Sequence, residues 1–261
     1  MSDWLPIPAS TYAGSIDNLI WVITAIVGVW FLLAEGILFW FIFRYRRRAG
    51  QPAGYVRGDR KSQTAWILIP CVAILGFDLY IDASSARVWE EMKQSQPPHE
   101  LLIRIEGRQW SWTMTHPGPD GRLDTPDDIV APNEVHVPQG SVVRFELRSA
   151  DTLHSLWVPE LRLKQDAVPG RTFTGWFEAT RPGSYGVLCA ELCGAAHGMM
   201  RGTMIVHGPE EYRAWLDEAT APVAATPAAT TPAATAPAAT APAASAPAAS
   251  APQPTGGSTG S

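Results

Sequence analysis

Five potential metal ligands of a soft chemical type are concentrated in the C-terminal half of the sequence. Four of them lie in one loop-like segment, Cys189-Ala-Glu191-Leu-Cys193-Gly-Ala-Ala-His197-Gly-Met-Met200, and His154 precedes this segment by 35 residues. Two thiolates, two imidazoles and a thioether favour copper over magnesium, calcium or manganese. Zinc would take four Cys and His ligands and leave the methionine without a role. The pattern therefore predicts a copper site.

The presence of two cysteines favours two copper ions rather than one. A mononuclear blue-copper site uses one Cys, two His and a weak axial Met. Four residues apart in one loop, the sulfurs of Cys189 and Cys193 can both point inward and bridge two metals. One histidine then remains for each copper, with Met200 and a main-chain carbonyl to complete them. A dinuclear thiolate-bridged copper centre fits better than any single-metal site.

A disulfide between the same two cysteines is the structural alternative. Such a bond would form in an oxidising compartment, and it could also precede metal loading. It accounts for Cys189 and Cys193 but leaves His154, His197 and Met200 as a coincidence. The third cysteine, Cys71, lies in an apolar run and is expected to be a small buried apolar residue.

The N-terminal part of the chain predicts a membrane anchor. Residues 19–43 form an apolar run of 25 residues with Glu35 as its single charge, which at about 1.5 Å per residue is long enough to cross a bilayer. A cleaved signal peptide is not favoured, because residues 1–18 contain two aspartates and no basic residue, and the run is too long.

A second span is expected at residues 64–83, with Trp66 and Tyr80 near its two ends, where aromatic rings prefer the headgroup level. Seven of the 20 basic residues lie between the two runs, in 44–61. Positive loops stay on the cytoplasmic side, so residues 1–83 should form an N-terminal segment and a two-helix hairpin in the inner (plasma) membrane, with the rest of the chain on the outer, periplasmic side. This segment is the only dense cluster of basic residues in the sequence, and it adjoins an apolar run. A nucleic-acid-binding protein is therefore excluded.

Residues 84–218 predict an all-β domain, and residues 219–261 a disordered tail. Short alternating runs lie at 101–105, 110–114, 142–147, 173–177, 184–188 and 203–206, separated by Pro-Gly and Pro-Asn turns. This spacing is typical of a β-sandwich or small barrel, and a brief helix should follow at 208–218. The tail has neither charge nor aromatic ring and carries a proline every five residues from Pro222 to Pro252, so it cannot build a core.

With these elements in place, the chain resembles cytochrome c oxidase subunit II, the CuA-bearing subunit of haem-copper oxidases. The resemblance spans about residues 15–218. It rests on the hairpin, on the C-x-E-x-C-x3-H-x2-M loop with its upstream Leu153-His154-Ser155, and on the segments at 109–112, 133–138 and 164–171. It implies a cupredoxin-like β-barrel or sandwich on a transmembrane hairpin.

The resemblance also implies a role for each site residue. Cys189 and Cys193 would bridge both coppers. His154 and Met200 would complete one copper, and His197 with the main-chain carbonyl of Glu191 the other. The carboxylate of Glu191 would be free to help hold magnesium at the contact with subunit I.

Trp110 matches the tryptophan at which family members receive electrons, whereas composition alone favours a buried strand aromatic. The implied function is electron entry into an oxidase, an oxidoreductase and proton translocase. A c-type cytochrome would reduce the dinuclear copper, which passes electrons to haem in subunit I, where oxygen becomes water. All the copper ligands are present, whereas relatives that oxidise quinol lack them. Gln63 replaces a glutamate common at a proton-uptake entrance, so that role is not expected here.

The sequence also predicts an acidic surface on the outer domain. Residues 84–212 hold 17 acidic and 12 basic residues, a net charge of −5, which would attract a basic cytochrome, although solubility requires a similar excess. Four acids are candidates for docking, or else belong to a solvated loop: Asp124, Asp127, Asp128 and Asp151.

Two other functions use a similar copper loop. A copper-delivery protein would cycle copper(I) on the cysteines and the methionine, but it has no use for Trp110 or for the hairpin. The copper domain of nitrous oxide reductase lacks an N-terminal hairpin. The two predicted spans therefore favour the oxidase subunit.

Overall fold

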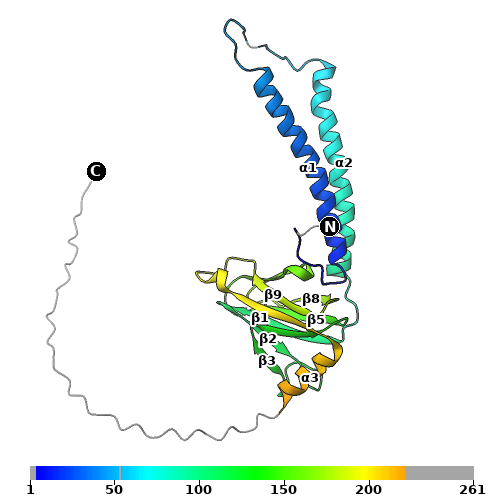
Figure 1. Cartoon of the computed structure of the whole chain (residues 1–261), viewed down its shortest axis with the longest axis vertical. Coiled ribbons are helices and arrows are strands. Elements are labelled where there is room, and N and C mark those ends of the chain that lie inside the picture. Colours follow the sequence, from blue (N-terminus) through cyan, green and yellow to red (C-terminus); the bar gives the residue numbers. More distant parts are fainter. Residues whose placement is uncertain (1–3, 53, 222–261) are drawn as a thin grey trace, which may run out of the picture. The chain divides into compact units, whose positions relative to one another are not determined.

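The computed structural model describes residues 4–52 and 54–221 (Figure 1). Most of the expected tail, residues 222–261, lies outside the described residues. Ala219 and Thr220, which the sequence assigned to the tail, belong instead to the last helix.

Two long helices form the N-terminal hairpin. Helix α1 spans Ala13–Arg44 and helix α2 spans Lys61–Trp89, and both are long and apolar enough to cross a membrane. Their apolar side chains are largely exposed, and the rings of Trp30 and Phe77 meet between them at a centroid distance of 6.5 Å. The two apolar runs of the sequence are thus confirmed as helices. The expectation that Cys71 is buried was wrong, because it lies on the exposed surface of α2.

Helix α2 continues past the end expected at residue 83. Residues 84–89 contain neither Gly nor Pro, so nothing in the chain stops the helix there. A π-helical turn, η1 (Glu90–Gln94), follows directly. The first proline after this turn is Pro97. The outer domain therefore begins after this turn.

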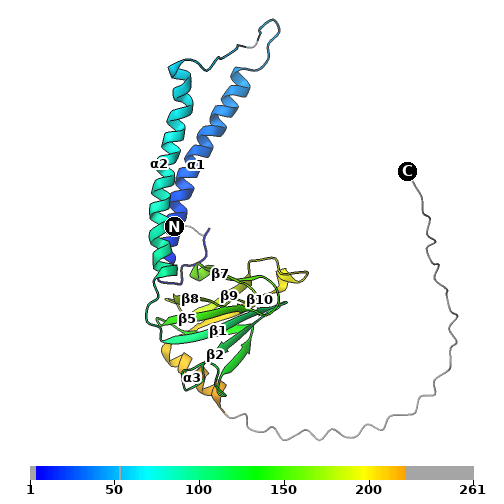
Figure 2. The ribbon, with the colours of Figure 1, turned by 180° about the vertical axis from the view of Figure 1, so that it is seen from behind.

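The outer domain is a sandwich of two sheets (Figures 1 and 2). Each sheet has five strands. The first sheet has the order β3-β2-β1-β5-β8, with strands Ile129–Pro132, Ser111–His116, Leu101–Arg108, Val142–Ser149 and Phe173–Glu178. The second has the order β4-β10-β9-β6-β7, with strands Glu134–Pro138, Arg201–His207, Gly183–Cys189, His154–Val158 and Leu163–Ala167. One parallel pair occurs in each sheet, β1 with β5 and β10 with β4. This all-β sandwich is the fold expected for a cupredoxin-like domain.

The core lies between the two sheets. Alternate residues of β1 and β5 are buried, among them Ile103, Ile105, Phe145 and Leu147, because successive side chains of a strand point to opposite faces. The six expected strands are all present. Strands β3, β4, β6 and β7 were not predicted. Each has only four or five residues, and β3, β6 and β7 also show little polar–apolar alternation.

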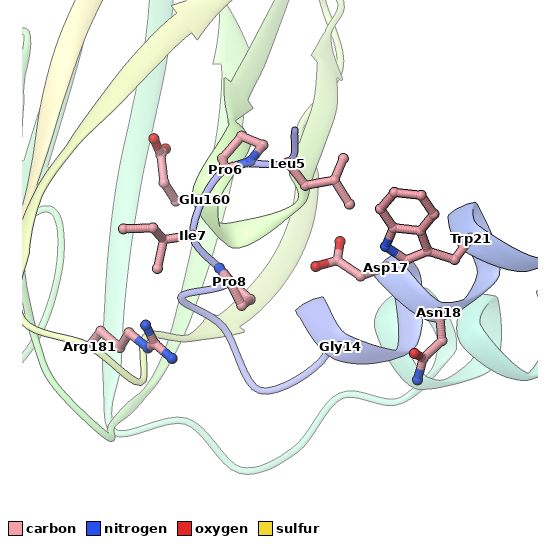
Figure 3. A pocket seen from close by; sticks show the side chains of 10 residues that line it. All are labelled: Leu5, Pro6, Ile7, Pro8, Gly14, Asp17, Asn18, Trp21, Glu160 and Arg181. Carbon is pink, nitrogen blue, oxygen red and sulfur yellow. The ribbon is translucent and has the colours of Figure 1, made fainter. Parts of the chain in front are cut away.

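The segment before α1 ties the hairpin to the sandwich. Ser10 forms a β-bridge with Ala179, and its hydroxyl donates to the carbonyl of Leu161 over 2.8 Å. Arg162 donates to both carboxylate oxygens of Asp17, at 2.7 and 3.0 Å. Figure 3 shows the pocket beside this segment, with Asp17 and Trp21 of α1 and with Glu160 from the sandwich in its lining.

Helix α3 (Pro209–Thr220) closes the described chain. It packs against β4 and β10, and both ribbon views place it beside β2 (Figures 1 and 2). Pro209 stands in its first turn, and Glu211 caps its start by accepting the N–H of Gly208 at 3.1 Å.

Candidate metal centre

The five predicted ligands come from the loop between β9 and β10 and from the start of β6. Cys189 is the last residue of β9, and Met200 immediately precedes β10. His197 begins a short 3-10 turn, η3 (His197–Met199). His154 joins them because β6 pairs antiparallel with β9, with Leu156 opposite Cys189. The strand pairing thus places His154 close to the loop ligands, although it lies 35 residues before Cys189 in the sequence.

The ligand atoms form one compact cluster. The sulfur of Cys189 lies 3.8 Å from the sulfur of Cys193 and 4.0 Å from Nδ1 of His154. The sulfur of Cys193 lies 3.6 Å from Nδ1 of His197 and 3.8 Å from the sulfur of Met200. The carbonyl oxygen of Glu191 is 3.3 Å from the sulfur of Cys189. All five side chains and the expected carbonyl therefore face a common centre.

The two thiols are free, so the alternative disulfide is not formed. Their sulfurs are 3.8 Å apart, whereas a disulfide requires about 2.05 Å. Burial raises the pKa of the Cys193 thiol to about 11, and the adjacent Cys189 adds to the effect. Near neutral pH the metal-free site would keep this proton, so a metal must displace it on binding.

The imidazole of His154 is held with one nitrogen toward the cysteines. Its Nε2 donates to Oδ1 of Asp151 over 2.8 Å, which fixes the tautomer and leaves the lone pair of Nδ1 facing Cys189. Asp151 also accepts the N–H groups of Gln109 and Thr152. Partial burial alone would raise the pKa of Asp151, but these donors and His154 lower it to about 2. Asp151, considered above as a docking acid, is thus an orienting partner of His154.

Removing the Asp151 carboxylate should weaken copper binding. We expect Asp151→Ala to raise the dissociation constant for copper about 10- to 100-fold, because an outer partner of a metal-binding histidine typically contributes that much. Asp151→Asn should retain most of the affinity, since its amide oxygen can still accept from Nε2. Competition with a chelator of known affinity measures both. Equal affinity of the alanine variant and the wild type would contradict this orienting role.

Trp110 lies in the turn between β1 and β2, not within a strand. Its side chain is 41% exposed, so the alternative of a buried strand aromatic was wrong. The indole packs against Gly194 of the metal loop, where an added Cβ would lie 3.3 Å from Nε1. Gly194 also has φ +126°, a conformation open mainly to glycine. One part of the Trp110 side chain is therefore exposed to solvent, while another part contacts the loop that carries the ligands.

Two further residues at the centre were not found from the sequence. Gln109 donates from Nε2 to the carbonyl of Cys193 at 2.7 Å, which pins the loop. Gly107 leaves room for His154, since an added Cβ would lie 3.1 Å from its ring. A glutamine and a glycine in a strand have no distinctive spacing, so only the folded sheet reveals these contacts.

The residues present fit a pair of copper ions. Two sulfurs, two imidazole nitrogens, a thioether and a carbonyl oxygen can supply each of two metals with the soft ligands that copper prefers. The ligands are largely buried and belong to a pinned loop on a rigid sandwich, so the geometry can change little between oxidation states. Such a site suits electron transfer rather than substrate binding.

Comparison with known proteins gives consistent matches. Residues 101–207 match the family model described as "Cytochrome C oxidase subunit II, periplasmic domain". The chain is 31% identical to cytochrome c oxidase subunit 2 of Thermostichus vulcanus, over 84% of this chain and 80% of that protein. It is 34% identical to the alternative cytochrome c oxidase subunit 2 of Bradyrhizobium diazoefficiens, over 83% and 84%.

Solved structures include a similar domain. The crystal structure of the periplasmic domain of subunit II of cytochrome oxidase from Bradyrhizobium japonicum covers 47% of this chain and 95% of its own length. It has 28% identity and a TM-score of 0.42.

Proposed function

The chain belongs to the cytochrome c oxidase subunit II family, and on this premise we propose that it is the electron-entry subunit of a haem-copper oxidase. It would accept electrons from a c-type cytochrome and deliver them to haem in subunit I, where oxygen is reduced to water with proton translocation. The convergence of five soft side-chain ligands and one carbonyl on a single centre carries this proposal.

Five side chains and one main-chain carbonyl would bind the two copper ions. The thiolates of Cys189 and Cys193 would hold the two ions together with His154, Met200, His197 and the main-chain carbonyl of Glu191. When bound, the pair would supply one-electron redox chemistry. The Glu191 carboxylate, which is partly exposed, would be available to magnesium at the subunit I contact. Burial of Cys193, Met200 and His154 excludes water from the ligands.

Trp110 would form the entrance for electrons. Its ring is exposed on one side and contacts Gly194 on the other, so a donor protein seated on it would lie one side chain away from the ligand loop. Leu192 and Met199, both strongly exposed, lie in the same loop and add apolar surface for a transient partner. The net negative charge of the outer domain would speed the approach of a basic cytochrome.

The hairpin would anchor this domain in the inner membrane beside other oxidase subunits. Exposed apolar side chains cover both helices, as lipid or neighbouring membrane helices require. The basic loop between the helices would lie in the cytoplasm, which places the metal centre on the outer side.

Electron entry can be tested in the assembled oxidase with Trp110→Ala. We expect the rate of copper reduction by reduced cytochrome c, followed by stopped-flow absorbance, to fall at least about tenfold. The copper spectrum should stay unchanged, because Trp110 supplies no ligand atom. Trp157→Ala is the matched control, since this tryptophan of β6 is similarly exposed at 39%. An unchanged rate in Trp110→Ala would remove this residue from the route.

A further inference from the structure

Three histidines that the metal centre does not use lie together under helix α3. His116 ends β2, His136 is in β4 and His207 ends β10. Trp215 of α3 covers them, with its ring 4.2 Å from that of His136 at an interplanar angle of 10° and 5.0 Å from that of His116, edge on. We call these four residues the imidazole cluster. Its members come from four different elements.

His136 and His207 share one hydrogen bond. Nδ1 of His136 is 2.8 Å from Nε2 of His207. The rings are nearly parallel, at 11°, with centroids 5.1 Å apart, so they lie edge to edge with the indole of Trp215 over His136. One nitrogen must donate and the other accept. A proton on both facing nitrogens would replace this bond with a contact between two positive donors.

His116 is placed to be neutral. It is fully buried, its Nε2 accepts the backbone N–H of His136 at 3.4 Å, and its Nδ1 has no partner among the described residues. Protonation of Nε2 would break that contact and leave a charged ring in an apolar site. The edge of Trp215 closes this site from the α3 side.

Few charges are available to balance added protons. Glu134 of β4 has a carboxylate oxygen 3.7 Å from Nε2 of His136, and Glu211 of α3 also acts on His207. Tyr212 of α3, near His207, stays neutral because burial raises its pKa to about 12. Two exposed carboxylates, those of Glu134 on β4 and Glu211 on α3, therefore face the three imidazoles.

Burial lowers the pKa of all three histidines, and that of His116 falls to about 3. Glu134 raises the pKa of His136 and His207 somewhat, and Glu211 that of His207, without reversing the shift. If α3 moved away, water would reach the three rings, and the pKa of each histidine would return toward its ordinary value of about 6.5. The open state then binds more protons than the closed one. Docking of α3 is thus strongest above about pH 6.5 and weakens as the pH falls below it.

We propose that α3 is a pH-dependent latch, which stays closed on the sandwich through Trp215 while the imidazole cluster is neutral and opens when acid protonates the cluster. Each proton taken up on opening shifts the opening equilibrium about tenfold per pH unit. Because Trp215 contacts the rings of His116 and His136, protonation of the cluster is coupled to the docking of α3.

Hydrogen exchange of the full-length chain in detergent tests the latch between pH 8 and pH 5. After correction for the intrinsic pH dependence of exchange, the opening constant of α3 amides should rise about tenfold or more per pH unit below 6.5, while that of β1 and β5 stays level. The double variant His136→Gln, His207→Gln should make this rise shallower, because only His116 of the cluster can then take up a proton on opening. His99→Gln, at an exposed histidine outside the cluster, should leave it unchanged.

Two results would overturn the proposal: an opening constant of α3 that is the same at pH 8 and pH 5, or an equal rise in the double variant. Should the double variant fail to fold, exchange at the imidazole C2 position in the wild type gives a second measurement. The proposal requires His116, His136 and His207 to titrate below 6.5. Titration of the pair at or above 6.5 would refute it.

Discussion

Replacing Cys193 with serine is expected to abolish the proposed two-copper centre while the chain remains folded. The sulfur of Cys193 lies within 3.8 Å of the ligand atoms of Cys189, His197 and Met200, so replacing it removes a thiolate that adjoins three other ligand atoms. A serine hydroxyl is close in size but is a hard oxygen donor, and it ionises far less readily than a thiol. Without this thiolate, we expect the remaining residues to hold fewer than two coppers.

Metal content and electron paramagnetic resonance measure this loss. The wild type should contain two coppers per chain, with one unpaired electron coupled equally to both nuclei. Cys193→Ser should lose that coupling and at least one copper. The matched control is Cys71→Ser, because Cys71 lies exposed on α2 and outside the cluster. A Cys193→Ser protein with two coppers and the wild-type spectrum would contradict the bridging role.

Phe145→Ala should cause a large loss of stability in the outer domain. Phe145 is fully buried in β5, and its ring lies 6.3 Å from that of Phe177. It also fills the space over Gly175, where an added Cβ would approach its ring to 2.4 Å. Removing a buried phenylalanine costs about 3–5 kcal/mol. Because domains are stable by only about 5–15 kcal/mol, this is a large fraction of the total.

Thermal unfolding of the full-length chain in detergent, with copper removed by a chelator, measures the effect. Val130→Ala is the control, since Val130 is 61% exposed on edge strand β3 and should change stability by at most about 0.5 kcal/mol. Gly175→Ala alone should also destabilise, by crowding Phe145. Combined with Phe145→Ala it should cost less than the sum, because the cavity accepts the methyl group. Additive losses would show that the two positions do not share this space.

The sequence alone predicted whatever depends on neighbouring residues. The hairpin follows from two apolar runs that are each long enough to form a spanning helix. Four of the five ligands follow from their spacing within one loop, since a short loop keeps its side chains close in any fold. The six longest strands follow from alternation of polar and apolar residues. Their positions needed no knowledge of the rest of the chain.

Only the tertiary structure decided which distant residues meet. Pairing of β6 with β9 brings His154 to the loop, and the turn before β2 brings Gln109 and Trp110 against it. The change in the role of Asp151, from docking acid to partner of His154, has the same origin. The imidazole cluster joins three strands and α3, which are separated by up to about a hundred residues. The physical reason is that strand register and sheet packing depend on the whole core, whereas helix length and loop spacing depend on the local chain.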